Sequence, residues 1–102
     1  MDAVADGEKC ECTVEVLSHM GLHARPAAVL ARMASGYNAQ LSLSKADGSG
    51  DAPDCRSILS LLMLAAGKGV KLHLSATGPE AARAASEVAA YFASSFGDEE
   101  NM

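Results

Sequence analysis

The sequence predicts an α/β (α+β) fold: an open-faced sandwich with an antiparallel sheet of about four strands covered on one side by three helices, in the order β-α-β-β-α-β-α. Three observations predict it. Stretches that alternate apolar and polar residues indicate strands with one buried face, which is typical of an antiparallel sheet with one side open to water. Between them lie stretches with apolar residues three and four apart, which indicate amphipathic helices. A chain of 102 residues suits one domain with a modest core.

The first third of the chain is expected to fold as a leader, a strand and a helix. Residues 1–10 are expected to form a flexible acidic leader. Alternation from Cys12 onward indicates the first strand. Gly21 is expected to turn the chain into a helix over about 25–35, which ends at Gly36.

The remaining elements follow from the same patterns. Alternation over 39–44 indicates a strand, and the glycine-rich segment 45–54 indicates a turn. Ser57 precedes a short apolar run, in the position of a helix N-cap. Alternation over 70–76 predicts the clearest strand. A final helix is expected to begin at Gly78-Pro79-Glu80, with the proline in its first turn. Its predicted apolar stripe consists of Ala81, Ala85, Val88, Phe92 and Phe96.

Composition and charge exclude several functions. The net charge is −5 and acidic residues gather at both ends, so the chain offers no basic stripe for nucleic acid. No signal peptide follows Met1 and no apolar run is long enough to span a bilayer, so we expect a cytoplasmic protein without membrane insertion. The domain is expected over 11–97, followed by an acidic tail at 98–102.

The three cysteines are expected to be buried or idle thiols. Cys10, Cys12 and Cys55 are odd in number, which argues against a closed set of disulfides. Cys10 and Cys12 share a strand face, but no spacing typical of metal ligands joins them to His73. We therefore expect no metal and no cofactor.

The chemistry is expected where the first helix begins. The stretch Met20-Gly21-Leu22-His23-Ala24-Arg25-Pro26 places a histidine and an arginine at a helix mouth, where backbone N–H groups and the positive end of the helix dipole attract an anion. Imidazole is partly uncharged near neutral pH and can attack phosphorus. The expected catalytic residues are therefore His23 and Arg25, with the phosphate held by Ala24 and Arg25 at the helix N-terminus.

Two motifs resemble the HPr family, the histidine phosphocarriers of the bacterial phosphoenolpyruvate:sugar phosphotransferase system. Residues 21–28 look like its active-site signature. Arg56-Ser57-Ile58-Leu59, followed by Leu61, Leu62 and Gly67-Lys68-Gly69, resembles its regulatory-serine segment. The resemblance covers roughly residues 12–96. It implies that His23 accepts a phosphoryl group from enzyme I and passes it to sugar-specific enzyme II acceptor domains. Such a protein is a carrier with a phosphohistidine intermediate, rather than an enzyme that turns over a small molecule.

The same resemblance implies further roles. Ser57 corresponds to the serine that a kinase phosphorylates and a phosphorylase restores, beside its role as a helix cap. The implied docking residues are Ile58, Leu59 and Leu62, with Arg32 and Arg56 as a basic rim for acidic partner surfaces. A monomer is expected. The family has a short strand after the 45–54 turn, but Pro53 lacks an N–H, which indicates an edge strand or a loop at 51–55.

Three other functions fit parts of the pattern. The same carrier could serve a regulatory branch that signals nitrogen or carbon status, and the motif does not separate the two. A small hydrolase of acylphosphatase type would need a glycine-rich anion loop and an asparagine that positions water, and neither has a good candidate near Arg25. In a non-catalytic ligand-sensing domain, His23 would be incidental.

Overall fold

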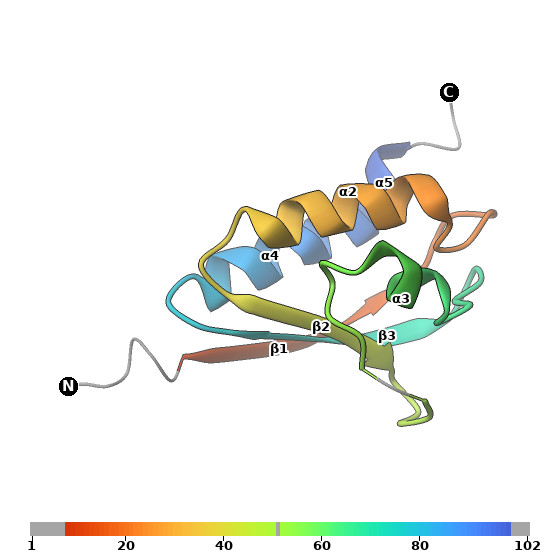
Figure 1. Cartoon of the computed structure of the whole chain (residues 1–102). Coiled ribbons are helices and arrows are strands. Elements are labelled where there is room, and N and C mark those ends of the chain that lie inside the picture. The colour runs from red at the N-terminus through yellow and green to blue at the C-terminus, as the bar shows by residue number, and fades with distance from the viewer. Residues whose placement is uncertain (1–7, 51, 99–102) are drawn as a thin grey trace.

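The structure, a computed structural model, describes residues 8–50 and 52–98 of the chain (Figure 1). Its elements in chain order are β1 (Lys9–Glu15), α2 (Ala24–Ser35), β2 (Gln40–Lys45), α3 (Ile58–Leu62), β3 (Lys71–Thr77), α4 (Ala81–Ala93) and α5 (Ser95–Asp98). The longest helix, α4, has 13 residues. Over the described part of the chain, no helix is long and apolar enough to cross a membrane.

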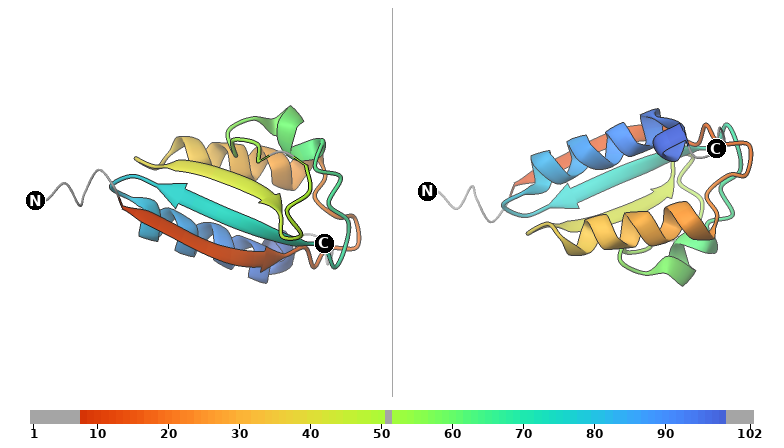
Figure 2. Two further views of the ribbon diagram at one scale, coloured as in Figure 1. Left: turned by 90° about the horizontal axis from the view of Figure 1, so that it is seen from below. Right: turned by 90° about the horizontal axis from the view of Figure 1, so that it is seen from above.

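The three strands of the described chain form one antiparallel sheet in the order β1-β3-β2. The central strand, β3, pairs with β1 from Lys71↔Glu15 to Thr77↔Lys9. On its other side it pairs with β2, where Thr77 lies opposite Gln40. Helices α2 and α4 run along one face of this sheet, and the other face is open (Figure 2). The predicted open-faced sandwich is confirmed, with three strands where about four were expected.

In segment 51–55, where an edge strand or a loop is expected, the described residues form only an isolated bridge, between Ser42 and Asp54. Two backbone hydrogen bonds surround it: Leu43 N–H donates to the carbonyl of Pro53 (3.2 Å), and Cys55 N–H donates to the carbonyl of Leu41 (2.9 Å). Pro53 has no N–H of its own, so the ladder does not continue through it. This segment is therefore a loop held to the edge of β2, and Asp51 lies outside the described residues.

A single core lies between the sheet and the two long helices. Alternate residues of β3 (Leu72, Leu74 and Ala76) are fully buried, which confirms the strand predicted from alternation. The whole apolar stripe predicted for the final helix is buried as well. Its last member, Phe96, does not belong to this helix, because α4 ends at Ala93 and Phe96 has a left-handed backbone (φ +56°). Phe96 is buried because it packs against Phe92, with ring centroids 5.2 Å apart. The helical and strand periodicities therefore predicted the two faces that form the core.

The start of the first strand differs from the expectation. β1 begins at Lys9 rather than near Cys12, so Lys9 and Cys10 belong to the sheet and not to a leader. The reason is tertiary, because Lys9 and Cys10 pair with Thr77 and Ala76 of β3. The rest of the expected leader, residues 1–7, and residues 99–102 of the expected tail lie outside the described residues.

The helix ends also differ in detail. Gly36 ends α2 in the right-handed conformation (φ −92°, ψ −5°) and donates its N–H to the carbonyl of Met33, so no left-handed turn is needed there. The N-cap of α4 is Glu80, which leaves Pro79 outside the helix instead of in its first turn. Glu80 Oε1 accepts the N–H of Asn38 (2.7 Å), so a contact with the loop before β2 decides where α4 begins.

The faces of β3 can be tested by two neighbouring substitutions. Leu74→Ala removes a fully buried side chain and should lower the free energy of unfolding by about 2–5 kcal/mol, because a cavity is left in a packed core. Ser75→Ala, one residue along on the open face, should change it by less than about 0.5 kcal/mol. Urea denaturation followed by circular dichroism measures both, and equal losses would contradict the assignment of the faces.

Candidate functional site

His23 is the N-cap residue of α2. Its backbone is extended (φ −113°, ψ −170°), and its carbonyl accepts the first helical hydrogen bond, from Ala27 N–H (2.9 Å). The side chain makes no capping bond, so the imidazole is not used to close the helix end. Helix geometry directs the N–H groups of the first turn, among them those of Ala24 and Arg25, out of this end, while Pro26 has none. The predicted site thus lies at a helix mouth.

The imidazole of His23 is half-buried, and its Nε2 atom has almost no accessible surface. A partner protein can deliver a phosphoryl group only to a nitrogen that it can reach. The burial of Nε2 therefore leaves Nδ1, the nitrogen nearer the backbone, as the candidate atom for the chemistry predicted at His23. Arg25, two residues on, is exposed at the same mouth, where a guanidinium can make charge-assisted hydrogen bonds to phosphate oxygens.

The loop that carries His23 is held against the loop between α3 and β3. Leu22 N–H donates to the carbonyl of Ala66 (2.8 Å), and Gly21 N–H donates to the carbonyl of Ser18 (3.0 Å). Gly21 has a φ of +72°, and a Cβ at this position would lie 2.7 Å from the Ala66 oxygen. Glycine is required here for both its conformation and its lack of a side chain.

Ser57 caps α3, as predicted. Its Oγ accepts the N–H of Ser60 (3.3 Å) and donates to Ser60 Oγ (2.9 Å). The hydroxyl therefore satisfies one backbone donor of the first helical turn. Helix α3 lies beside α2 in the fold, which brings the serine segment to the same side of the sheet as the histidine (Figures 1 and 2).

Exposed apolar side chains lie on α3 and on the loop before α2. Of the predicted docking residues, Ile58 is 42% and Leu59 is 70% exposed, and Leu62 is half-buried. Met63 (77%) and Met20 (67%) are also exposed, and sequence reasoning missed them. For Met63 the sequence offered one signal: it lies four residues after Leu59, on the same side of the short helix as that predicted docking residue.

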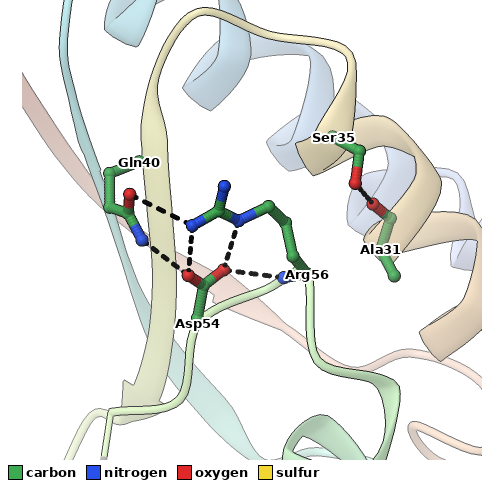
Figure 3. A network of polar contacts seen from close by, with 5 residues as sticks. All are labelled: Ala31, Ser35, Gln40, Asp54 and Arg56. Carbon is green, nitrogen blue, oxygen red and sulfur yellow. Dashed lines mark hydrogen bonds and ion pairs between the residues drawn. The ribbon is translucent and has the colours of Figure 1, made fainter.

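The two basic residues predicted as a rim are placed differently. Arg32 is exposed in the last turn of α2, about 13 Å along the helix axis from His23. Arg56 forms an ion pair with Asp54, with Nη2 2.8 Å from Oδ2 and Nε 3.2 Å from Oδ1 (Figure 3). Gln40 of β2 donates to the same carboxylate. The charge expected from Arg56 at a docking surface is therefore balanced locally.

This ion pair perturbs the titration of Asp54. The Arg56 guanidinium beside it is the main reason that the pKa of the Asp54 carboxyl lies below its usual range, and burial opposes the shift. These hydrogen bonds connect Asp54, in the loop at the edge of β2, and Gln40 of β2 to Arg56, the residue before Ser57.

Burial disfavours the thiolate form of two of the cysteines, Cys55 and Cys12. Cys55 is buried, and burial raises its pKa to about 12. Cys10 and Cys12 are half-buried against the core, and burial raises the pKa of Cys12. Since the thiolate is the reactive form, raised pKa values disfavour reaction. Over residues 8–50 and 52–98, no group of three or more His, Cys, Asp or Glu could hold a metal ion, and His73 instead lies 3.7 Å from Glu11.

Comparisons with known proteins decide the family. A family model described as the PTS HPr component phosphorylation site matches residues 10–94. The chain belongs to the HPr family of phosphocarriers. Over 87 residues it is 36% identical to the phosphocarrier protein NPr of Escherichia coli K12, which covers 85% of this chain and 94% of that protein. Over 85 residues it is 34% identical to the phosphocarrier protein HPr of Cupriavidus necator, covering 83% and 92%.

Solved structures of HPr proteins have the same fold as this phosphocarrier. The crystal structure of HPr-C-His from Thermoanaerobacter tengcongensis superposes with a TM-score of 0.79 at 30% identity and covers 87% of this chain and 97% of that one. HPr from Bacillus anthracis gives a TM-score of 0.75 at 30% identity and covers 82% and 96%. The fold implied by the two motifs is confirmed.

The need for glycine at position 21 can be tested in this phosphocarrier. Gly21→Ala should lower the free energy of unfolding by about 1–3 kcal/mol, because the residue is held at positive φ and the new Cβ meets the Ala66 carbonyl. Gly67→Ala is the matched control, since nothing lies within 4 Å of a Cβ there. Thermal denaturation of both variants measures the difference, and a tolerated Gly21→Ala would contradict the observed packing.

The ion pair at Asp54 can be tested by titration. Folding lowers the pKa of the Asp54 carboxyl, so its ionised form stabilises the folded protein. This contribution is complete at pH values above the pKa of aspartate in the unfolded chain, about 3.9, and it is lost as the pH falls through the pKa in the folded protein. Arg56→Ala should therefore raise the pKa of Asp54 toward its ordinary value, as followed by carbon-detected NMR. Arg32→Ala should leave it unchanged, and a shift of equal size in both variants would refute the assignment.

Proposed function

We propose that this phosphocarrier accepts a phosphoryl group on Nδ1 of His23 from phosphorylated enzyme I and passes it to acceptor domains of the phosphotransferase system. The observation that carries the proposal is the position of His23, whose ring stands at the N-cap of α2 without capping it and has its Nε2 atom buried. Membership of the HPr family supports the same assignment.

The transfer needs little from this chain beyond position. The Nδ1 lone pair attacks phosphorus, the bond from phosphorus to the donor nitrogen breaks, and the electron pair stays on the donor. Transfer onward reverses these roles with the acceptor as nucleophile. The helix end contributes about 0.3–1 kcal/mol to holding the anion, up to about 2 if it is partly buried. This modest hold suits a carrier, because the group must leave again, and partner proteins supply the remaining catalytic groups.

The acceptor belongs to one of two branches. Sugar-specific enzyme II domains are the acceptors that we propose first, in line with the similarity to the HPr of Cupriavidus necator. The similarity to NPr of Escherichia coli favours a second candidate, a branch that signals nitrogen status. Both branches draw on phosphoenolpyruvate, so we place the protein in the cytoplasm.

Docking and regulation belong to the same proposal. The apolar side chains proposed for partner binding are Ile58, Leu59 and Leu62. Arg32 and Arg56 are proposed as the basic residues around them, although Asp54 balances part of the charge of Arg56. Ser57 is proposed as the target of a serine kinase and phosphorylase, because a phosphate there would add up to about two negative charges at the beginning of α3. We propose a monomer, although one neighbour, Crh of Bacillus subtilis (TM-score 0.65), is described as a swapped dimer.

The function is tested by incubation with phosphoenolpyruvate and enzyme I. The wild type should gain a phosphate that is labile in acid and stable in base, and His23→Ala should gain none. His73→Ala, which removes the β3 histidine that lies beside Glu11 of β1, should be phosphorylated normally. Release of phosphate from an acyl phosphate without enzyme I would indicate the hydrolase instead, and no reaction of either kind would indicate a sensor domain.

The branch is tested by competition between donors and acceptors. Enzyme I of the sugar system and its nitrogen-branch counterpart are compared at equal concentration by the rate at which each phosphorylates His23. A sugar carrier should be phosphorylated faster by enzyme I of the sugar system and should pass the phosphoryl group to an enzyme II domain. A preference for the second donor would assign the chain to the nitrogen branch.

Arg25 is expected to contribute to transfer without contributing to stability. Arg25→Ala should slow phosphorylation by enzyme I about tenfold to a hundredfold, because a charge-assisted hydrogen bond is worth about 1.5–3 kcal/mol. Its melting temperature should stay near that of the wild type, since the side chain is exposed. Arg83→Ala, an exposed arginine on α4, is the matched control and should transfer normally; equal rates for both variants would exclude Arg25 from the site.

A further inference from the structure

The loop before α2 and the loop between α3 and β3 are joined at both of their ends. At one end Val16 N–H donates to the carbonyl of Val70 (3.0 Å), and Gly69 N–H donates to the carbonyl of Val16 (2.7 Å). At the other end Leu22 N–H donates to the carbonyl of Ala66 (2.8 Å). This last bond lies immediately before His23, so it helps to set where the N-cap of α2 stands.

The Ala66 carbonyl is held in place by its surroundings. Ala66 is 3% exposed, and Gly21 lies so close to its oxygen that a side chain would not fit between them. A buried carbonyl needs a hydrogen-bond donor, and the N–H of Leu22 provides one. Movement of this carbonyl would leave a buried polar group unsatisfied and release the residue next to His23.

Ala65 is the residue that turns the chain toward this bond. Its φ is +53°, in the left-handed region that residues other than glycine enter at a cost. Its N–H donates to the carbonyl of Leu62, so the turn continues directly from the last turn of α3. Its side chain is exposed, so no packing of its methyl group explains the conformation. The conformation is retained because hydrogen bonds on both sides of the turn depend on it.

We propose that the turn at Ala65 and Ala66 is a positioning element for the phosphoryl transfer at His23. It fixes Leu22, and through Leu22 the N-cap of α2, in the geometry in which an incoming phosphoryl group meets the imidazole. The turn also follows directly on α3, the helix proposed for partner docking. It therefore connects α3 to the loop that carries His23. The inference rests on the proposed function of His23, which it refines.

The experiment varies how readily residue 65 adopts a left-handed conformation. Ala65→Val introduces a β-branched residue, which strongly disfavours positive φ, and its extra methyl groups face solvent. Ala65→Asn adds a side chain of similar size that tolerates this region, and Ala65→Gly removes the cost entirely. Side-chain size and backbone preference are thereby separated.

Two measurements are made on each variant. Hydrogen exchange of the Leu22 amide, measured by NMR without any partner, should be at least about tenfold faster in Ala65→Val, while Ala65→Asn and Ala65→Gly keep the wild-type rate. Phosphorylation by enzyme I should show kcat lowered about tenfold to a hundredfold in Ala65→Val with KM little changed, because misplacement of a reacting group by about 1 Å has an effect of this size. The other two variants should transfer at the wild-type rate.

Several outcomes would overturn the inference. One is an Ala65→Val variant in which the Leu22 amide exchanges, or the phosphoryl group is transferred, at the wild-type rate. Another is faster exchange or slower transfer in Ala65→Asn or Ala65→Gly. These last two variants decide the matter if the valine variant does not fold. Ala82→Val, on the exposed side of α4, is the control for a general loss of stability and should leave both readouts unchanged. A wild type that accepts no phosphate would contradict the proposed function instead, while the exchange of Leu22 would still test the positioning.

Discussion

The hydrogen bond from Leu22 N–H to the carbonyl of Ala66 is the contact on which the rest of the site depends. It joins the loop that carries the reacting histidine to a loop that is remote in sequence. Gly21 makes the close approach possible, and Ala65 turns the carbonyl into place. Helix α2 then begins at His23 in a fixed direction, with its first N–H groups and the imidazole at the same mouth. A short backbone contact thus fixes the start of α2, and we propose that it also sets the geometry of the reaction at His23.

The energetics of the site fit a carrier better than a trap. A helix end and one exposed guanidinium stabilise an anion, but neither is deeply buried, and water screens both. The charge of Arg56, by contrast, is balanced locally by Asp54. We therefore propose that recognition rests on exposed apolar side chains such as Leu59 and Met20, which a partner surface can bury.

Local patterns predicted much of the fold, and the misses share one cause. The stripe of α4 as far as Phe92, the alternation of β3 and the cap at Ser57 depend on neighbours within a few residues, and all were predicted from the sequence. The start of β1 at Lys9 and the N-cap of α4 at Glu80 depend on partners in other segments. A pattern within one segment carries no information about such a partner, so these boundaries were wrong.

The sequence by itself determined the helix that begins at His23 and the faces that form the core, and it pointed to His23 as the nucleophile that we propose, because residue spacing and helix-end chemistry act locally. Only the tertiary structure decided which nitrogen of His23 is buried, that Arg56 is paired with Asp54, and that Ala66 holds the loop of the site. These features arise where segments distant in the chain meet. Their geometry depends on how the sheet and the helices pack together, which the order of residues in any one segment does not contain.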